Sequence, residues 1–424
     1  MTSGRMSVCV FSNLYPPLVS GSSVNSSALS LELARRGHRL FVITARVDSD
    51  TPEYEETDGV AVYRLPAIRL PRLPIALNFP WLSYTFTPGN LRRIDRIFRR
   101  RRPDVIHLHN HMFDLSLSAV WARRRFGIPL VITIHTMIRH TRRIYNLLLY
   151  PADRVLLRCL VAGNAHTLLC PDFNIIKYVR EAFPTARRAF IPYGMDLPDD
   201  PAPDHVALLR KRHGLEGKRV ILSLGHVHSL RDRRHLISAL PAVRRAVPNV
   251  AALIVGAETT DAPRKLAREL GVQDAVIFAG HAPHEDVPAY LALADLEMHL
   301  FVQGDVENTS PGIASMEAMS AGKATMTAAN ENTFGPGVLR NGRNVILVNP
   351  DRPEETASTI VDLLRDDAKR GRIGQAARQM VQENLSWDLV CRKTLEAYQN
   401  AIGETCREDP RRSHLSSPAR EVDP

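Results

Sequence analysis

The sequence predicts an α/β protein made of two Rossmann-like domains, each with a parallel sheet, that face a cleft. Short apolar runs alternate with helical patterns along most of the 424 residues, which is typical of βαβ units. The alternation stops at a Pro- and Asp-rich stretch, 193–205, and then restarts, so this stretch is the predicted linker. With 44% hydrophobic and 24% charged residues, the composition is that of an ordinary globular protein and excludes disordered and fibrous classes.

The first predicted domain, residues 1–197, opens with a strand at 7–13. A turn-rich stretch and a helix follow, and the helix stops at a basic turn closed by Gly37. A strand at 39–44 completes the first βαβ unit, so the sheet is predicted to be parallel. The expected buried face of the first helix consists of Val24, Ala28 and Leu31. The later elements predicted in this domain are strands at 104–110, 129–135, 166–171 and 188–192 and a helix through 119–125.

The second predicted domain, residues 198–385, repeats the alternation. Its elements are predicted as strands at 219–228, 249–256, 275–280, 294–301, 324–328 and 344–348 and helices at 231–245, 262–271 and 312–322. A C-terminal helix at 386–402 is expected to pack back on the first domain. The tail, 403–424, is rich in Arg, Ser and Pro and is predicted to be disordered. Because ligands bind at the carboxyl ends of parallel strands, the cleft between the domains is the predicted site.

The composition also limits the cellular setting. No run of about 18 apolar residues is present, so no segment is predicted to span a bilayer, and the apolar stretch near the N-terminus is too short for a signal peptide. We therefore expect a cytoplasmic protein. The cysteines are widely spaced and lack a CxxC pair, which argues against a disulfide framework or a cysteine zinc site. They are Cys9, Cys159, Cys170, Cys391 and Cys406.

Positive charge is concentrated in the first half of the chain. Residues 1–197 hold 27 Lys and Arg against 14 Asp and Glu, whereas the remainder is slightly acidic. This asymmetry indicates an anionic partner. Nucleic acid is disfavoured because no binding motif is present and aromatic residues make up only 6%.

An anionic membrane surface fits the basic half better. The segment 64–102 predicts a basic amphipathic helix with an apolar face beside a loop that contains Pro, Trp and Phe, and two interpretations of the helix stay open. Either the helix adsorbs to anionic lipid, or the apolar face packs on the sheet and the arginines are solvated. The apolar face consists of Leu91, Ile94, Ile97 and Phe98.

The segment 307–326 carries the clearest chemical signal. Gly312 leaves backbone N–H groups open at a predicted helix start, Pro311 occupies a position that helices tolerate, and such a start suits a phosphate or diphosphate. Glu317 follows within the same helix, where its carboxylate can accept hydrogen bonds from two hydroxyl groups, as a ribose offers. The alternative is a glutamate that is merely solvated.

Three other segments carry weaker signals. Arg231, Arg233 and Arg234 follow a strand–loop transition and could clamp a diphosphate, or they could form a solvated helix face. The loop 19–25 could wrap a phosphate or simply turn the chain. The three histidines of HLHNH alternate along a predicted strand and therefore share one face, which suits a metal ion, but no acidic or cysteine partner is near in the sequence. We therefore expect them to line a cleft without metal. They are His107, His109 and His111.

Taken in order, these segments resemble the retaining glycosyltransferases with the GT-B fold, of the family 4 type, which includes phosphatidylinositol mannosyltransferases and diacylglycerol glucosyltransferases. The likeness extends over most of the chain. The segments that carry it are RRGHRLFVIT, RPDVIHLHN, PLVITIHT, IPYGMDL, VILSLGHVHSLRDR, NVAALIVG, AVIFAGHAPHEDVPAYLALADL, SPGIASMEAMSAGKATM and NGRNVILVNP.

The resemblance implies that the second domain binds a nucleotide-sugar donor and the first an acceptor. Glu317 matches the glutamate that binds the donor ribose, Arg231 the position of a diphosphate-binding lysine, and His109 a histidine that approaches the donor sugar. The catalytic residues implied are His109, Glu307 and Arg231. The donor-binding residues implied are Gly21, Ser22, Gly225, His226, Arg231, Asn308, Thr309, Ser310, Pro311, Gly312, Ile313 and Glu317.

The sequence departs from the family pattern at three places. The first of two paired glutamates would fall at Thr309, whereas Glu307 lies two residues earlier. Either Glu307 reaches in through a longer loop, or Asn308 and Thr309 replace it in contacting the sugar hydroxyls. The diphosphate arginine is replaced by His226, and the paired-glycine loop is reduced to Gly21 and Ser22. The resemblance still implies transfer with retention and without metal or cofactor, because the protein supplies the positive charge.

The leading hypothesis is therefore a glycosyltransferase that acts on a lipid-linked or polysaccharide acceptor at the inner membrane face. A nucleotide-sugar epimerase or hydrolase of the same fold is the second hypothesis, and it predicts product from donor and water alone. A non-catalytic GT-B-like binding protein is the third.

Overall fold

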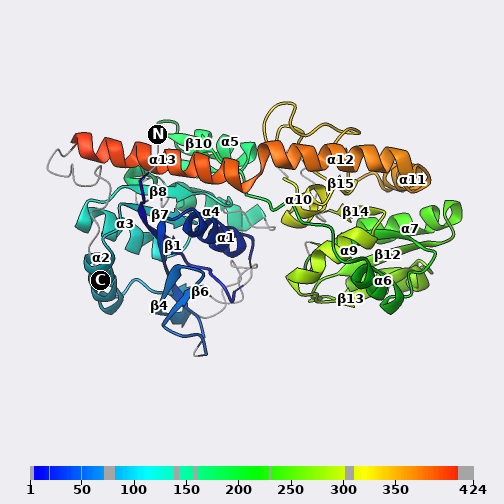
Figure 1. Ribbon diagram of the computed structural model, residues 1–424, viewed down its shortest axis with the longest axis horizontal. Helices are drawn as coiled ribbons and strands as arrows, with labels where there is room; N and C mark the ends of the chain where they lie inside the picture. Colours follow the sequence, from blue (N-terminus) through cyan, green and yellow to red (C-terminus); the bar gives the residue numbers. More distant parts are fainter. Residues whose placement is uncertain are drawn as a thin grey trace. The chain divides into compact units, whose positions relative to one another are not determined.

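The chain forms two compact units in the computed structural model (Figure 1). One unit comprises Met1–Gly194 and Trp387–Pro424, and the other comprises Met195–Ser386. Each unit carries its own parallel sheet and its own hydrophobic core, which confirms the predicted fold class. The structure describes residues 4–18, 20–48, 50–70, 82–137, 143–155, 158, 161–228, 231–300 and 310–408.

The first unit contains an eight-stranded sheet in the order β10-β9-β8-β7-β1-β2-β4-β3. All neighbours are parallel except β3 and β4. Every residue of the central strands β1 and β7 is buried, as expected when helices cover both faces of a sheet. The strands are β1 (Ser7–Ser12), β2 (Arg39–Arg46), β3 (Tyr54–Thr57), β4 (Val60–Pro66), β7 (Val105–His109), β8 (Leu130–Thr133), β9 (Thr167–Cys170) and β10 (Arg188–Phe190), with β5 (Ile68–Leu70) and β6 (Leu82–Tyr84) paired separately.

Two layers of helices cover this sheet. Residues of α1 and α13 pack with Val8 and Val10 of β1, whereas α2, α3 and α5 pack with Cys9 and Phe11 on the opposite face. The alternation of β1 side chains between the two clusters follows from the period of two in a strand. The helices are α1 (Gly21–Arg35), α2 (Pro88–Arg101), α3 (Leu115–Phe126), α4 (Arg143–Val155), α5 (Phe173–Ala182), α13 (Trp387–Glu408) and the short η2 (Ala162–Asn164).

The buried face of α1 agrees only in part with the predicted one, because Ala28 and Leu31 pack against the core whereas Val24 is exposed. Val24 is 40% exposed, while Ser23, Ser26 and Ser30 are buried. The hydroxyl oxygen of Ser26 lies 3.1 Å from that of Ser12 on β1, and Ser30 donates to the carbonyl of Ser26. Because these hydroxyl groups find partners, small polar residues can face the sheet and bring the helix close to it.

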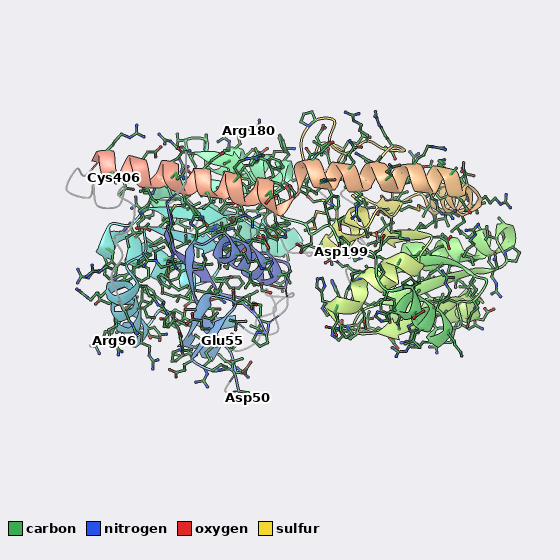
Figure 2. All side chains as sticks on the ribbon, in the orientation of Figure 1. Asp50, Glu55, Arg96, Arg180, Asp199 and Cys406 are labelled. Carbon is green, nitrogen blue, oxygen red and sulfur yellow. The ribbon has the colours of Figure 1, made fainter. Side chains whose placement is uncertain are left out.

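The apolar face of α2 is part of the core. Ile94 and Phe98 are almost fully buried, and Leu91 and Ile97 pack against the same cluster. Of the two interpretations of this helix, packing on the sheet is therefore correct. The arginines remain on the outside, as Arg96 illustrates (Figure 2).

The second unit contains a six-stranded sheet in the order β13-β12-β11-β14-β15-β16, parallel throughout. The chain moves outward from β11 to β13 and then returns to the other side of β11 with β14. Such a switch point opens a crevice at the carboxyl ends of the two strands it separates. The strands are β11 (Arg219–Leu224), β12 (Val250–Val255), β13 (Val276–Gly280), β14 (Leu296–His299), β15 (Thr325–Thr327) and β16 (Ile346–Leu347).

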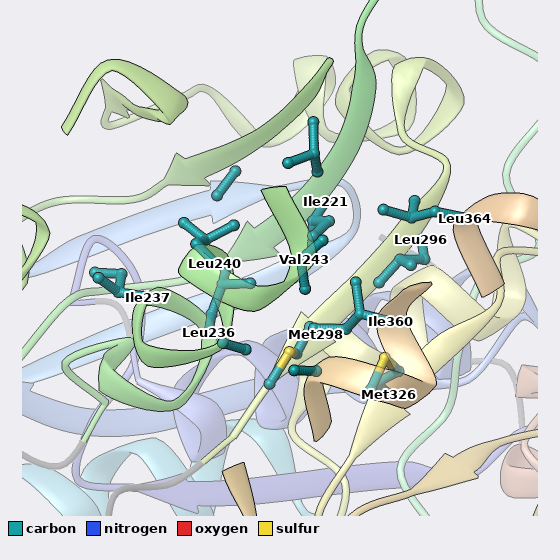
Figure 3. Packing of buried hydrophobic residues seen from close by; sticks show 14 of the residues in the cluster. Ile221, Leu236, Ile237, Leu240, Val243, Leu296, Met298, Met326, Ile360 and Leu364 are labelled. Atoms are coloured by element: carbon teal, nitrogen blue, oxygen red, sulfur yellow. The ribbon is translucent and has the colours of Figure 1, made fainter. Parts of the chain in front are cut away.

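The largest core cluster of this unit lies between one face of the sheet and helices α7 and α11. Ile221, Leu240, Met298 and Ile360 are among its buried members (Figure 3). Helices α6, α9 and α10 cover the other face. The helices are α6 (Pro203–Arg212), α7 (Arg234–Ala246), α8 (Ala262–Glu269), α9 (Val287–Leu293), α10 (Ile313–Ser320), α11 (Pro353–Arg365) and α12 (Asp367–Asn384), with the short η3 (Gln273–Ala275) and η4 (His284–Asp286).

Helix α13 belongs to the first unit and extends to Glu408. The hydroxyl of Tyr398 lies 2.7 Å from Nδ1 of His107 on β7, and that of Thr405 lies 3.1 Å from Nε2 of His166. The expected disorder from residue 403 is therefore wrong for 403–408, because this last turn still has buried contacts. Within the described ranges, no helix is both long enough and apolar enough to cross a membrane.

Candidate functional site

The neighbouring strands β11 and β12 are each followed directly by a glycine with positive φ. Gly225 has φ +100° and Gly256 has φ +149°, and residues with a Cβ rarely adopt these backbone conformations. A Cβ on Gly256 would lie 2.5 Å from the carbonyl carbon of Gly225. The N–H of Gly225 donates to Val255 over 2.9 Å, and that of Val227 donates to Ala257 over the same distance. The loop after β11 is thus held by backbone contacts with the end of β12.

Arg233 holds this turn from within. It has φ +62° and is 4% exposed, and its guanidinium donates to the carbonyls of Leu224 (3.0 Å) and Gly225 (2.6 Å). Burial lowers the pKa of Arg233 to about 10, so it stays cationic at neutral pH. Arg234 is engaged by Asp232 over 2.6 Å. Neither side chain is therefore the open diphosphate clamp that the sequence allowed.

Arg231, the first arginine of this run, is half-buried. Burial lowers its pKa, and its positive charge helps to lower the pKa values of His228 and His299. These effects place the guanidinium near the ends of β11 and β14. His226 follows Gly225 in the same loop, and its side chain is exposed.

His299, the last residue of β14, was not identified from the sequence. It is buried, and its Nδ1 lies 2.6 Å from the carbonyl oxygen of Leu224, so Nδ1 carries the proton. Its ring is 3.4 Å from a Cβ built on Gly225 and 3.7 Å from one built on Gly312. The ring therefore separates the glycine turn from the start of α10 and fixes their spacing. No local pattern marks it as a site residue, because it is a single histidine at the end of a buried strand.

Helix α10 begins at Ile313, and the residue at its N-cap, Gly312, has no side chain to cap it. The amides of Ile313, Ala314 and Ser315 are thus the open N–H groups of a helix N-terminus, next to the buried Pro311 and the half-buried Ser310. A helix start of this kind attracts a phosphate through its N–H groups and its dipole.

Glu317 lies one turn further along α10 and its side chain is 28% exposed. Burial raises the pKa of Glu317, and the nearby His284, 4.0 Å away, opposes this rise. The second unit therefore carries Gly225, Arg231, Gly312 and Glu317 on the segments that surround the ends of β11 and β14. Glu307, Asn308 and Thr309 lie outside the described residues.

Glu297 is a second acidic residue of this region that the sequence did not single out. It is fully buried on β14 beside Leu222 of β11. Desolvation raises its pKa to about 8, while a hydrogen bond with the hydroxyl of Ser315 and the charge of Arg233 oppose the rise. The group is therefore mostly protonated at neutral pH.

In the first unit, Gly21 and Ser22 form the first turn of α1 rather than a loop. The hydroxyl of Ser20 accepts from the N–H of Ser23, and that of Ser23 accepts from the N–H of Ser20, at 3.1 and 2.7 Å. This reciprocal cap is a stable helix start. The expected wrapping loop is therefore wrong, although the N–H groups of a helix start suit an anion equally well.

The three histidines of HLHNH do not share one face. Strand β7 ends at His109, and Asn110 has φ +68°, so the chain turns before His111. Nε2 of His111 lies 3.0 Å from a carboxylate oxygen of Asp153, which also accepts from Tyr178. No group of three metal-binding side chains occurs among the described residues.

His109 is buried at the carboxyl end of β7 beside His107, with 4.1 Å between the ring centres. Its Nδ1 lies 2.9 Å from Nε2 of His135, which follows β8. Both nitrogens of His107 have partners, the hydroxyls of Tyr398 and Thr133. These partners were not predicted because they lie far away in the sequence.

Two family models match the chain. A glycosyl transferase 4-like domain matches residues 20–194, and the glycosyl transferases group 1 domain matches residues 207–380. Among similar proteins is the alpha-monoglucosyldiacylglycerol synthase of Streptococcus pneumoniae, 24% identical over 77% of this chain and 71% of that protein. Another is the GDP-mannose-dependent alpha-(1-6)-phosphatidylinositol monomannoside mannosyltransferase of Mycolicibacterium smegmatis, 30% identical over 54% of this chain and 62% of that protein.

Solved structures of glycosyltransferases share the fold. The sucrose-phosphate synthase of Thermosynechococcus elongatus superposes with a TM-score of 0.74 at 19% identity, over 94% of this chain and all of that one. Anabaena HepE in complex with UDP gives 0.72 at 18% identity, over 93% of this chain and all of that one. Since the two domain models together match most of the sequence and the fold agrees, the chain belongs to the GT-B glycosyltransferase family.

Proposed function

We propose that this protein is a retaining glycosyltransferase that moves a sugar from a nucleoside-diphosphate sugar to a lipid-linked or polysaccharide acceptor. The observation that carries the proposal is the set of groups in the second unit around the ends of β11 and β14. Arg231, the open amides at the start of α10 and Glu317 lie there. A cation and N–H groups suit a diphosphate, and a carboxylate suits the hydroxyls of a ribose.

The proposed reaction breaks the bond between the anomeric carbon and the diphosphate and forms one to the acceptor oxygen on the same face of the sugar. The electron pair of the broken bond stays on the diphosphate, which then takes the proton of the acceptor hydroxyl. Arg231 and the amides of α10 would stabilise the negative charge that develops on the diphosphate. Because these groups supply positive charge, we propose that no metal or cofactor is needed.

Relatives indicate which nucleotides to test. The mycobacterial mannosyltransferase is named for its use of GDP-mannose, and HepE was solved with UDP. UDP- and GDP-sugars are therefore the first donors to examine, with ADP-sugars as a third group.

Helix α4 supports an acceptor that lies at a membrane. Ile144, Leu147 and Tyr150 are spaced three residues apart and are 69%, 75% and 41% exposed, so large apolar side chains of one helix face water. Such a face adsorbs to a lipid surface when basic residues assist it. The basic surplus of residues 1–197 supplies this charge. We therefore propose that α4, and not α2, contacts the membrane, at its cytoplasmic face.

A thermal-shift screen of UDP-, GDP- and ADP-sugars tests the donor site. We expect one class to raise the melting temperature of the wild-type protein, and Glu317→Ala to weaken its binding by about 10- to 100-fold, because hydrogen bonds to a charged group are lost. Glu269→Ala, an exposed change at the end of α8, is the matched control. If no nucleotide sugar stabilises the protein, the proposal is wrong. Product formed from donor and water alone would favour the epimerase or hydrolase.

Sedimentation with lipid vesicles tests the membrane contact. We expect the protein to bind vesicles that contain phosphatidylglycerol and not vesicles of phosphatidylcholine alone, and Leu147→Asp to abolish binding. Leu208→Asp places the same change on α6, where Leu208 is 55% exposed, and should leave binding intact. Equal binding by wild type and Leu147→Asp would exclude α4 as the contact.

A further inference from the structure

Three aromatic side chains of the first unit form a hydrogen-bonded row that ends at His109. Nδ1 of His109 lies 2.9 Å from Nε2 of His135, and Nδ1 of His135 lies 2.9 Å from the hydroxyl oxygen of Tyr193. The two imidazole planes differ by only 25°, and their centres are 5.1 Å apart. The bonded nitrogens of His109 and His135 are much closer to each other than the two ring centres are. The rings therefore meet edge to edge, and the lone pair of the accepting nitrogen lies near the plane of the donating ring.

All three groups are neutral at physiological pH. Burial lowers the pKa of His135 to about 3 and that of His109 well below its ordinary range, and it raises the pKa of Tyr193. A neutral imidazole carries one N–H and one bare nitrogen. The row therefore has only two consistent arrangements, with every hydrogen bond pointing toward His109 or every one pointing toward Tyr193.

The chemistry of the end groups decides between them. A phenol proton, with an ordinary pKa of about 10, is far more acidic than the N–H of a neutral imidazole, and the imidazole nitrogen is the better acceptor. Tyr193 therefore donates to Nδ1 of His135. Nε2 of His135 then carries the proton and donates to Nδ1 of His109, and aligned bonds of this kind reinforce one another.

The other neighbours of His109 do not compete for its nitrogens. The ring of His107 lies beside it at an angle of 38°, but Nδ1 and Nε2 of His107 are engaged by Tyr398 and Thr133 at 2.7 and 2.8 Å. The remaining nitrogen of His109, Nε2, is buried and has no hydrogen-bond partner among the described residues. It lies at the carboxyl end of β7, the edge of a parallel sheet where ligands bind.

We propose that Tyr193 and His135 keep the proton of His109 on Nε2, so that His109 presents a fixed N–H donor to an oxygen of the bound nucleotide sugar. This inference rests on the proposed function for the identity of the ligand. His135 and Tyr193 are positioning residues, since they act through His109. A fixed donor recognises an oxygen acceptor and does not act as a general base, so His109 binds and orients its ligand instead of taking a proton from it.

The tautomer can be measured without activity. In protein with ¹⁵N-labelled histidine, the ring nitrogens show directly which one carries the proton, and His109→Gln identifies the His109 signals. We expect the proton of His109 on Nε2 in the wild type and a mixture of tautomers in Tyr193→Phe. Tyr398→Phe removes a hydroxyl from the neighbouring His107 and should leave the His109 signals unchanged. A proton on Nδ1 in the wild type, or an unchanged tautomer in Tyr193→Phe, would overturn the proposal.

A second pair of variants guards against misfolding. His135→Gln keeps an N–H₂ group that can donate to His109, whereas His135→Leu does not. We expect His135→Gln to retain the Nε2 proton of His109 and His135→Leu to lose it, with both checked by circular dichroism. Loss of the Nε2 proton in both variants would contradict the role given to His135.

Binding identifies the oxygen and separates this proposal from the function itself. Tyr193→Phe should weaken binding of the nucleotide sugar about three- to tenfold, the effect of one neutral hydrogen bond. A loss for the nucleotide sugar but not for the free nucleoside diphosphate assigns the N–H to a sugar hydroxyl, and a loss for both assigns it to a phosphate oxygen. Unchanged binding of both overturns the ligand role. If no nucleotide binds the wild type while the Nε2 tautomer is observed, the proposed function fails and the proton assignment stands.

Discussion

Replacing Glu297 by Gln should stabilise the second unit, and increasingly so as the pH rises. The carboxyl group is fully buried on β14, and the hydroxyl of Ser315 on α10 is its hydrogen-bond partner. Burial raises its pKa from 4.5 to about 8. Gln resembles the protonated form in shape but cannot ionise, so the substitution removes the titration and leaves the packing nearly unchanged.

The sign and size follow from the two pKa values. Between pH 4.5 and 8, the folded protein keeps a proton on Glu297 that the unfolded chain has already lost. The unfolded state is therefore favoured as the pH rises through this window, and the free energy of unfolding of the wild type falls. At 1.36 kcal/mol for each unit of pKa shift, this cost grows by about 2 kcal/mol between pH 6 and pH 8. The stability advantage of the Gln variant should grow by the same amount.

Urea unfolding near pH 6 and near pH 8 measures this difference. The probe must report the second unit, but the sequence has no tryptophan within residues 195–386, so tryptophan fluorescence is unsuitable. Hydrogen exchange of peptides that contain β11 and β14 follows the correct unit. Comparing variant with wild type at each pH cancels the titration of every other group.

An exposed glutamate provides the control. Glu269→Gln, on the surface at the end of α8, should show the same free energy difference from wild type at both pH values. The reasoning is refuted if the Glu297→Gln advantage is equal at the two pH values or shrinks as the pH rises. Either result would mean that the carboxylate is ionised in the folded state, paired with a cation such as Arg233.

Three further predictions address the site. Gly256→Ala should cost about 2–4 kcal/mol of unfolding free energy, because its Cβ would overlap the backbone of Gly225. Gly271→Ala, also at positive φ but with open space around it, should cost about 1 kcal/mol in the same urea titration. Arg231→Ala should weaken the affinity for a nucleotide sugar about 10- to 100-fold by calorimetry, whereas Arg245→Ala on the exposed side of α7 should not change it. Turnover in metal-free buffer with EDTA should equal turnover without EDTA, and a loss restored by Mg²⁺ or Mn²⁺ would contradict the proposed charge stabilisation by the protein alone.

The local pattern predicted the central strands well because their residues are buried on both faces. Strands β1, β7, β11 and β12 are mostly apolar, and each lies within the range expected for it. The pattern overestimated their length. The strand expected at 219–228 ends at Leu224, because Gly225 takes a positive φ that a strand cannot continue.

Helix faces were predicted less well, since apolar spacing is only one way to bury a helix. On α1, serines rather than Val24 face the sheet, and their hydroxyls are satisfied by Ser12, Leu18 and their own helix. A sequence pattern that counts only apolar residues misses a face of this kind. The exposed apolar face of α4 was not predicted either. The spacing of apolar residues along a helix does not show whether another element covers them.

The run Arg231 to Arg234 shows why the site was predicted only in part. The sequence offers three arginines of equal charge beside one aspartate. The fold distinguishes them through backbone conformation, because the positive φ of Arg233 turns its side chain inward to the carbonyls of Leu224 and Gly225. Asp232 then pairs with Arg234. The roles of equivalent residues are thus decided by contacts that only the folded chain makes.

The chemistry of His109 depends most strongly on distant residues. Its place at a strand end was predictable, but its hydrogen-bond partner follows the next strand, and the partner of His107 lies 291 residues away on α13. A lone histidine at this position would titrate near neutral pH and exchange its proton between two nitrogens. In the folded chain, burial keeps it neutral and the row from Tyr193 selects one nitrogen. A substitution at Tyr193 should therefore change the tautomer of His109, although Tyr193 reaches His109 only through His135. The identity of the residue at position 109 alone does not reveal this dependence.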